Sequence, residues 1–529
     1  MNLYQTLKHY FGYDTLRPGQ QDLMEGILNG SDVLGIMPTG AGKSLCYQVP
    51  ALMLPGITIV ISPLISLMSD QVKALNQAGV HAAYINSSLT ENQIRAALLY
   101  AAQGQYKIIY VAPERLNTMR FLDFACRADI SMVTVDEAHC ISQWGQDFRP
   151  SYLEIADFLA RLPRRPVVSA FTATATERVK QDITGSLHLQ NPVTVVTGFD
   201  RPNLFFRVVK RKGGKETDNS ILNYVKRHED ESGIIYCATK KNVDSVCELL
   251  LQHGILAGRY HAGLSLEERK ESQDDFTYDR IRVMVATNAF GMGIDKSNVR
   301  FVIHYNMPQS MENYYQEAGR AGRDGEPAKC ILLFSTQDVM ISKLLLGSKD
   351  FEGMDFQEIE QVKHQDSRRL QLMEGYCMTT SCLRNYILEY FGETTHQPCD
   401  NCGNCHQEFE ELDMTLDAKW VVGCITEMRG RYGQALVIGT LLGSKKARLK
   451  DIGATSYNCY GQLENRTEAD LRLLISQMIR MGYITQTEGE YSVLKAGNIA
   501  DLQNKNTKII IKKFKEKEKI NKKIIKKEN

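Results

Sequence analysis

The chain has 529 residues, of which 43% are hydrophobic and 24% charged, a composition typical of a globular protein with about three or four domains. Its net charge of +1 is unevenly distributed, because residues 504–529 hold 11 lysines and 3 glutamates and leave the rest of the chain net acidic. This excludes a uniformly basic nucleic-acid-binding protein, so any such contact needs local basic grooves. No apolar run reaches the roughly 20 residues of a membrane span, and residues 1–10 lack a secretory pattern, so we expect a cytoplasmic protein without membrane contact.

Short apolar runs alternate with helix-like segments over the first 205 residues. They predict strands at Val33–Met37, Thr58–Ser62, Ile108–Ala112, Met132–Asp136 and Val167–Thr172. The rhythm continues to about residue 336, with runs at Gly233–Cys237, Val283–Thr287, Phe301–Tyr305 and Lys329–Phe334. Such runs separated by helical segments are typical of parallel sheets with crossover helices. We therefore predict two tandem α/β domains with ligands at the carboxyl ends of their strands.

A cluster of Tyr13, Arg17 and Gln20 precedes the first predicted strand. A glutamine amide can hydrogen-bond adenine, and a tyrosine ring or a guanidinium can stack on it. These residues are therefore candidate adenine contacts. An ordinary amphipathic helix with capping residues has the same composition, and the residues alone favour that interpretation.

A glycine-rich turn joins the first predicted strand to a helical segment, with the sequence Pro38-Thr39-Gly40-Ala41-Gly42-Lys43-Ser44. Backbone N–H groups of such a loop, including those of its threonine and glycines, wrap phosphates. We expect Lys43 to reach the β- and γ-phosphates and Ser44 to bind Mg²⁺. Met37 stands where the general pattern has its first glycine. The strand–loop–helix setting favours a phosphate-binding loop over a chance glycine turn.

Two carboxylates, Asp136 and Glu137, end a later predicted strand in the sequence Asp136-Glu137-Ala138-His139. An aspartate there can hold the Mg²⁺ shell, and the glutamate can orient or activate the attacking water. The alternative is an acidic pair at a helix N-terminus. The phosphate-binding loop upstream favours the catalytic interpretation.

Arg320 and Arg323 lie in the second domain, within the sequence Gln316-Glu317-Ala318-Gly319-Arg320-Ala321-Gly322-Arg323. Three residues apart on a helix, they share one face and can stabilise charge on a γ-phosphate across a cleft. The glycines beside them indicate close approach by another backbone. The alternative is that both arginines lie on a solvent-exposed helix face, as such pairs usually do.

A cysteine cluster follows a helical region at residues 354–393 and consists of Cys382, Cys399, Cys402 and Cys405. Four thiolates make a tetrahedral site, and two-residue gaps let successive sulfurs converge on one Zn²⁺. A closed site of this kind leaves no ligand position for catalysis, so we expect a structural role. Reduced cysteines in a loop and an iron–sulfur cluster are the alternatives. Cys377 is expected to be a buried thiol outside the site.

An ordered set of motifs resembles those of superfamily 2 helicases, and specifically of the RecQ family. Besides the phosphate-binding loop and the Asp136–His139 box, the set comprises Ile61–Leu64, Val111–Arg115, Phe171–Ala175, Tyr236, Tyr260–Gly263, Ala286–Lys296 and Gln316–Arg323. The resemblance covers roughly residues 1–495. It implies RecA-like motor domains at 1–205 and 206–340, a zinc-binding segment at 341–408 and a winged-helix DNA-binding domain at 409–497.

The resemblance also implies an activity. It is that of a DNA-stimulated ATPase that moves 3′ to 5′ on single-stranded DNA and separates duplex or branched DNA in recombination, repair, replication and the SOS response. The implied cofactors are ATP, Mg²⁺ and Zn²⁺. The implied partners are single-stranded and duplex DNA and a single-stranded DNA-binding protein, and we expect the enzyme to act as a monomer. Nothing in the residue spacing itself indicates the direction of movement.

The stretch Ser142–Pro150 directly follows the Asp136–His139 box and resembles the aromatic-rich loop with which RecQ helicases sense single-stranded DNA. Trp144 and Phe148 can stack on bases, worth about 1–3 kcal/mol per base, and Arg149 can meet a phosphate. Packing of the two rings in the core is the alternative.

The segment 409–497 resembles the RecQ winged helix. We expect helices at Val437–Leu442 and Leu471–Arg480, and a wing formed by Tyr483–Thr485 and Tyr491–Leu494. A basic run lies between the helices, at Lys445, Lys446, Arg448 and Lys450. A basic turn with a helix N-terminus can hold duplex phosphates, although a solvated charged loop has the same composition. The Tyr457–Gly461 turn is a candidate strand-separating hairpin.

The chain ends in a lysine-rich tail, residues 498–529, where many bacterial RecQ members have a further helical domain. The tail lacks a packed-core pattern, so we expect it to be disordered. It can bind DNA through phosphates, or its bias toward Lys, Ile and Asn reflects an altered reading frame in AT-rich DNA. The missing domain affects the expected recognition of DNA structures and not the motor.

Two other functions fit part of the pattern. The first is an RNA helicase of related motor type, against which the zinc segment and the aromatic-rich loop argue. The second is a DNA-binding scaffold with an inactive motor, against which the complete set of phosphate-handling residues argues. A measurement of DNA-stimulated ATP hydrolysis distinguishes the motor from the scaffold.

Overall fold

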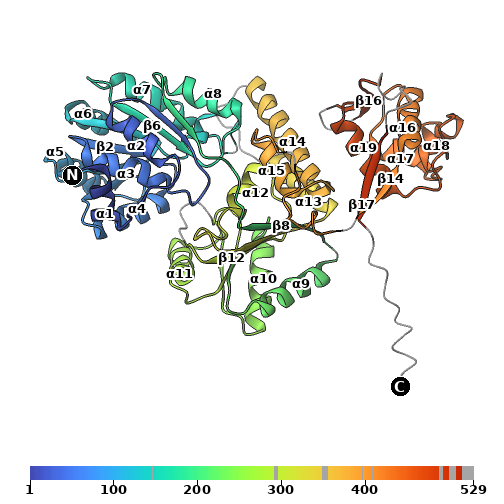
Figure 1. The fold of residues 1–529 in the computed structure, drawn as a ribbon, viewed down its shortest axis with the longest axis horizontal. Helices are drawn as coiled ribbons and strands as arrows, with labels where there is room; N and C mark the ends of the chain where they lie inside the picture. The colour runs from blue at the N-terminus through green and yellow to red at the C-terminus, as the bar shows by residue number, and fades with distance from the viewer. Residues whose placement is uncertain are drawn as a thin grey trace. The chain divides into compact units, whose positions relative to one another are not determined.

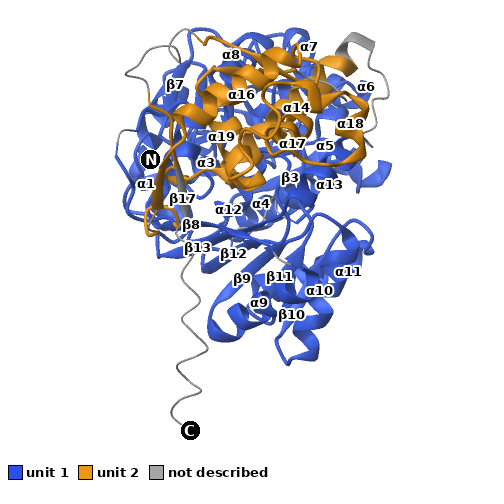
Figure 2. Cartoon of the chain, turned by 90° about the vertical axis from the view of Figure 1, so that its right-hand side faces the viewer, with its two compact units in different colours: residues 1–349, 384–402 blue, residues 350–383, 403–529 orange. Residues whose placement is uncertain are grey.

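The structure is a computed structural model that describes residues 1–145, 147–211, 213–290, 296–347, 356–395, 397–407, 409–487, 493–499 and 508–514. The chain divides into two compact units, and Figure 2 colours them blue and orange. Unit 1 comprises residues 1–349 and 384–402, and unit 2 comprises residues 350–383 and 403–529. Within the described ranges, no helix combines the length and the apolar character that crossing a membrane requires.

The first lobe of unit 1, coloured from blue to teal in Figure 1, contains a parallel sheet. The sheet has seven strands in the order β3-β4-β2-β5-β6-β1-β7. Its strands are β1 Val33–Ile36, β2 Ile57–Ile61, β3 Ala82–Ile85, β4 Ile108–Val111, β5 Ile130–Val135, β6 Val167–Thr172 and β7 Val193–Val196. Its helices are α1 Leu3–Phe11, α2 Gln20–Leu28, α3 Lys43–Met53, α4 Ile65–Gln77, α5 Glu91–Ala102, α6 Met119–Arg127, α7 Glu154–Arg161 and α8 Glu177–Ser186. Strands β1, β2 and β4 are buried along their whole length, as strands covered on both faces must be.

The second lobe of unit 1 is a six-stranded parallel sheet in the order β10-β11-β9-β12-β13-β8. Its strands are β8 Leu204–Lys210, β9 Ser232–Tyr236, β10 Ala257–Tyr260, β11 Val283–Ala286, β12 Val299–His304 and β13 Ala328–Phe334. Its helices are α9 Gly214–Arg227, α10 Lys240–Gln252, α11 Leu266–Thr277, α12 Met311–Ala318 and α13 Thr336–Gly347. The two parallel sheets confirm the predicted tandem α/β architecture.

The strands that the sequence pattern missed are the four edge strands of these sheets, β3, β7, β8 and β10. An edge strand is covered less completely than a central one, so it lacks a continuous apolar run. Residues Val193–Val196 of β7, for example, alternate between half-buried and exposed. The nine central strands carry the signal and appear within two residues of their predicted positions.

Unit 2 contains helix α14, Phe356–Met378, and a helical domain with two small antiparallel sheets. The domain's helices are α16 Thr415–Glu427, α17 Gln434–Leu441, α18 Ala447–Asp451 and α19 Glu468–Arg480. Strands β15 Ile484–Gln486 and β16 Leu494–Ala496 pair at the predicted wing. The predicted wing residues Tyr491 and Ser492 lie outside the described residues. The Tyr457–Gly461 segment forms turns and no strand.

Part of the predicted disordered tail is a strand, which corrects the sequence-based expectation. Residues Ile510–Phe514 form β17 and pair antiparallel with β14, Phe409–Asp413. Ile509 and Ile511 are both fully buried in the core of the domain. Two isoleucines two residues apart point to the same face of a strand, and this short apolar signal was hidden by the lysine-rich composition around it.

Truncation of Ile511 is expected to destabilise this domain by about 2–5 kcal/mol, because Ile511→Ala leaves a cavity in the core. Ile510→Ala is the matched control, since Ile510 is 39% exposed. The chain has two tryptophans, Trp144 in unit 1 and Trp420 in α16. Urea unfolding of a Trp144→Phe protein, followed by Trp420 fluorescence, therefore reports on the domain itself. A midpoint for Ile511→Ala equal to that of the Trp144→Phe parent would show that the Ile511 side chain adds nothing to the stability of the domain.

Candidate functional site

The phosphate-binding loop lies between β1 and α3, at the carboxyl end of β1 in the first sheet. Gly40 and Gly42 have φ values of +85° and +82°, a backbone conformation that glycine adopts without strain. Helix α3 begins at Lys43, whose ammonium group donates to the Met37 carbonyl at 3.1 Å. Burial lowers the pKa of Lys43, while the Glu137 and Asp136 carboxylates raise it. The loop thus places a lysine and a helix N-terminus where an anion would be stabilised.

The upstream cluster contacts the phosphate-binding loop. The buried Gln20 amide donates to the carbonyls of Ala41 and Gly42 at 3.0 and 3.1 Å. The Arg17 guanidinium donates to the Gly40 carbonyl. Tyr13 is 55% exposed. Gln20 and Arg17 therefore brace the loop, and contact of the three side chains with adenine stays a prediction.

The carboxylate pair lies directly after β5. Asp136 is buried, and burial, followed by the adjacent Glu137 carboxylate, raises the pKa of Asp136 to about 7, while Lys43 opposes this shift. Glu137 has φ 48° and ψ 46°, a left-handed conformation that is strained for a residue with a Cβ and is typical of functional sites. A divalent cation beside Ser44 and Asp136 would offset the cost of burying the negative charge of Asp136. A hydroxyl and a carboxylate are oxygen donors, so this pair fits Mg²⁺.

The two arginines of the second lobe lie beyond the end of a helix, and Arg323 packs against this loop. Helix α12 ends at Ala318, and Arg320 and Arg323 lie in the turns that follow, because Gly319 caps the helix and Gly322 adopts φ +55°. A Cβ placed on Gly40 would lie 3.2 Å from Arg323 Cγ. Arg323 also lowers the pKa of Lys43 through charge repulsion. The expected helix is thus wrong. Arg323 meets the phosphate-binding loop within unit 1, whereas the buried Arg320 interacts with Tyr236 of the second lobe.

The aromatic-rich loop is half-buried and held by two neighbouring elements. The Arg178 guanidinium of α8 covers the Trp144 ring at 3.0 Å from its centroid. Ser142 Oγ donates to the Asp182 carboxylate of α8 at 2.5 Å. Arg149 pairs with Asp147 at 3.0 Å and donates to the Pro63 carbonyl at 2.8 Å. No sequence pattern signals the Arg178 contact, because it depends on how α8 packs beside the loop.

The four predicted cysteine ligands come together. The sulfur atoms of Cys382, Cys399, Cys402 and Cys405 all lie within 4.8 Å of one another. This arrangement fits a tetrahedral ion with Zn–S bonds of about 2.3 Å. The Asn404 amide donates to the carbonyls of Thr379 and Ser381 at 2.9 and 2.8 Å, which fixes the backbone beside two of the ligands.

Four family models match the chain in succession. They are the DEAD/DEAH box helicase at residues 17–183, the helicase conserved C-terminal domain at 216–325, the RecQ zinc-binding model at 336–406 and the RQC domain at 408–520. The ATP-dependent DNA helicase RecQ of Bacillus subtilis (strain 168) is 45% identical over 92% of this chain and 81% of that protein. The chain belongs to the RecQ helicase family. RecQ of Pasteurella multocida (strain Pm70) is 40% identical over 90% of this chain and 73% of that protein.

Solved structures share the fold of the RecQ motor. DEAD-box helicase Mss116 bound to ssRNA and UDP-BeF aligns with a TM-score of 0.55 at 16% identity, over 73% of this chain and 86% of that chain. S. cerevisiae Dbp5 bound to RNA and ADP BeF3 aligns with a TM-score of 0.53 at 19% identity, over 69% of this chain and 97% of that chain. At such low identity the likeness concerns the fold alone, and it confirms the RecA-like lobes.

The basic run of the RecQ winged helix lies where the sequence placed it. Lys445, Lys446, Arg448 and Lys450 are exposed around α18, and Lys446 is the residue at the N-terminal cap of that helix. The buried Leu449 anchors the helix to the domain core. An exposed basic turn is suited to phosphates, and its contact with DNA stays a prediction.

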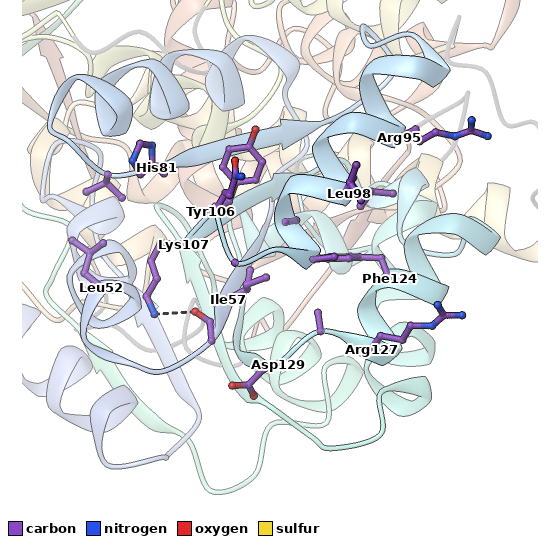
Figure 3. A pocket seen from close by; sticks show the side chains of 18 of the residues that line it. Leu52, Ile57, His81, Arg95, Leu98, Tyr106, Lys107, Phe124, Arg127 and Asp129 are labelled. Atoms are coloured by element: carbon purple, nitrogen blue, oxygen red, sulfur yellow. Dashed lines mark hydrogen bonds between the residues drawn. The ribbon is translucent and has the colours of Figure 1, made fainter.

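A separate cavity of about 1030 Å³ lies on the first lobe of the RecQ motor (Figure 3). Its lining includes the residues just before or at the amino ends of four strands, namely Ile57, His81, Lys107 and Asp129. Lys107 donates to the Gly56 carbonyl at 2.8 Å within it. Ligands of parallel sheets bind at the carboxyl ends of strands, so this cavity does not belong to the nucleotide site.

Proposed function

We propose that the chain is an ATP-dependent DNA helicase that hydrolyses ATP in response to single-stranded DNA, moves 3′ to 5′ and separates duplex or branched DNA. The observation that carries the proposal is the placement of Arg323 against Gly40 of the phosphate-binding loop. A nucleotide bound to that loop would touch both lobes, so its hydrolysis would change how the lobes are held. The names of the RecQ relatives support DNA as the substrate.

Each residue of the cleft has a proposed task in hydrolysis. Lys43 holds the β- and γ-phosphates, and Asp136 and Ser44 would hold Mg²⁺, which neutralises phosphate charge when bound. Glu137 orients the attacking water and accepts its proton. Arg320 and Arg323 stabilise charge on the transferred γ-phosphoryl group. Tyr13, Arg17 and Gln20 would bind the adenine and brace the loop.

Contact with DNA is proposed at two places. In the aromatic-rich loop, Trp144 and Phe148 stack on bases and Arg149 binds a phosphate. In the winged helix, Lys445, Lys446 and Arg448 bind duplex phosphates. The zinc site would hold the segment between motor and winged helix, and the protein would act as a monomer with a single-stranded DNA-binding protein as partner.

Loss of the Trp144 ring is expected to weaken DNA stimulation. Trp144→Ala removes a stacking contact worth about 1–3 kcal/mol, so the DNA concentration for half-maximal ATP hydrolysis should rise by roughly 5- to 150-fold. Hydrolysis without DNA should be unchanged. Tyr278→Ala is the control, because Tyr278 is an aromatic residue outside the aromatic-rich loop that also has an arginine beside it. Unchanged stimulation in Trp144→Ala would remove this residue from the coupling role.

Strand separation on defined substrates tests the proposed function. We expect ATP-dependent unwinding of a DNA duplex with a 3′ single-stranded tail, and little with a 5′ tail or with an RNA duplex. Preference for the RNA duplex would favour the RNA helicase alternative. DNA binding without DNA-stimulated ATP hydrolysis would favour the inactive scaffold.

A further inference from the structure

The linker between the two lobes of the motor contains a partly buried arginine, Arg201, that reaches both sides of the nucleotide cleft. The linker joins β7, the last strand of the first sheet, to β8 of the second. One guanidinium nitrogen, Nη1, donates to the Thr39 carbonyl of the phosphate-binding loop at 3.0 Å and to the Gly319 carbonyl at 3.2 Å. The other, Nη2, donates to the carbonyls of Ala321 and Gly322 at 3.0 and 2.8 Å. One side chain thus binds four backbone carbonyls of two lobes.

Three of these carbonyls, those of Gly319, Ala321 and Gly322, belong to the backbone that carries the proposed arginine pair. Gly319 and Ala321 flank Arg320, and Gly322 precedes Arg323. They also follow the C-terminus of α12, where carbonyls lack partners within the helix and carry partial negative charge. A planar guanidinium has five donors in a fixed fork, so it can hold such a turn in one conformation. Asn203 adds a bond of 2.8 Å to the Gly322 carbonyl.

The linker itself is held by residues 384–402, which pack against it in unit 1. Arg384 donates to the Asp200 carboxylate at 2.5 Å and to the carbonyls of Arg201 and Leu204 at 2.6 Å each. The Phe391 ring stacks on Phe199 with centroids 4.4 Å apart. Arg201 therefore projects from a backbone fixed on both of its sides, and its direction is set by the fold.

We propose that Arg201 is a positioning residue of the motor, which aligns the arginine-bearing turn with the phosphate-binding loop when the cleft is closed. The inference rests on the proposed function, since it assigns Arg201 a part in that same hydrolysis. Three of its bonds stay within the second lobe and its linker, and the bond to Thr39 alone crosses to the first lobe. Opening of the cleft would break that bond and leave the turn in place.

Steady-state ATP hydrolysis with saturating single-stranded DNA tests the proposal. Arg201→Ala should lower kcat at least 10-fold and change the KM for ATP less than 3-fold, because the loop still binds nucleotide while the arginine pair is misplaced. Arg201→Lys should recover only part of the loss, since an ammonium group cannot reach four carbonyls at once. Arg207→Ala is the control, because Arg207 is exposed on the neighbouring strand β8. Binding of a fluorescent ATP analogue verifies that each variant is folded.

A double-mutant cycle separates positioning from a purely structural role. If Arg201 acts through the arginine pair, Arg201→Ala with Arg323→Ala should lose no more than about 3-fold beyond Arg323→Ala alone. Full additivity, or a wild-type kcat in Arg201→Ala, would overturn the proposal. Should Arg201→Ala fail to fold, Arg201→Lys in the same cycle decides the matter. Absence of DNA-stimulated hydrolysis in the wild-type chain would instead overturn the proposed function.

Discussion

Lys43→Ala is expected to lower DNA-stimulated ATP hydrolysis by about 10²–10³-fold or more, and with it to abolish strand separation. Lys43 begins α3 inside the phosphate-binding loop, and no other cation of the first lobe is proposed to hold the phosphates. Its ammonium group interacts with the buried Asp136 carboxylate and the partly buried Glu137 carboxylate, so its removal takes away a compensating positive charge. A pre-organised charge lost from a buried site costs far more than one lost from the surface.

Phosphate release and separation of a fluorescently labelled DNA duplex measure this effect together. Lys8→Ala is the matched control, because Lys8 lies in a helix of the same lobe and pairs with Asp14 at the surface. The control should retain wild-type rates. Substantial unwinding by Lys43→Ala would contradict the assignment of this loop as the motor's nucleotide site.

Cys402→Ser is expected to release zinc and to unfold the segment that the metal holds. Cys402 is fully buried, and its sulfur lies within 4.8 Å of three other thiols. Structural zinc contributes about 10–16 kcal/mol to folding in small zinc domains, so loss of one ligand affects both metal content and stability. We expect bound zinc to fall from one ion per chain to nearly none, with a lower melting temperature.

Cys377→Ala is the control for this variant, because Cys377 is a buried cysteine outside the four-thiol cluster. It should keep one zinc ion per chain, measured by metal analysis after dialysis. A Cys402→Ser protein that retains the full zinc content and melts as the wild type does would remove Cys402 from the ligand set. An iron signal in the wild-type chain would favour a cluster over zinc.

Much of the motor could be predicted because its signals are local. A central parallel strand such as β2 is buried on both faces, so its apolar run is continuous in the sequence. The phosphate-binding loop is a contiguous stretch with a fixed order of residue types. The spacing of the four cysteines predicts that their sulfur atoms converge on one site. Each of these patterns follows from bonding requirements that the chain satisfies within a few residues.

Other features depend on distant parts of the chain and left no such pattern. Arg201 has no motif around it, and its four carbonyl partners lie in segments far away in the sequence. The stacking of Arg178 on Trp144 is of the same kind. The predicted helix ran past the true end of α12 at Ala318, because Gly319 and Gly322 were interpreted only as points of close packing. In each case tertiary structure, and not local preference, decided the outcome.

The pairing of β14 with β17 has a consequence for how the winged-helix domain is made. The domain's first strand can complete its sheet only after all of its helices, α16 to α19, have been synthesised, because its partner follows them. Contacts between such distant segments slow folding, and an unpaired strand invites pairing with another chain. We therefore expect newly made chains that stop before Lys508 to leave Phe409–Asp413 without its partner strand and the domain core without Ile509 and Ile511.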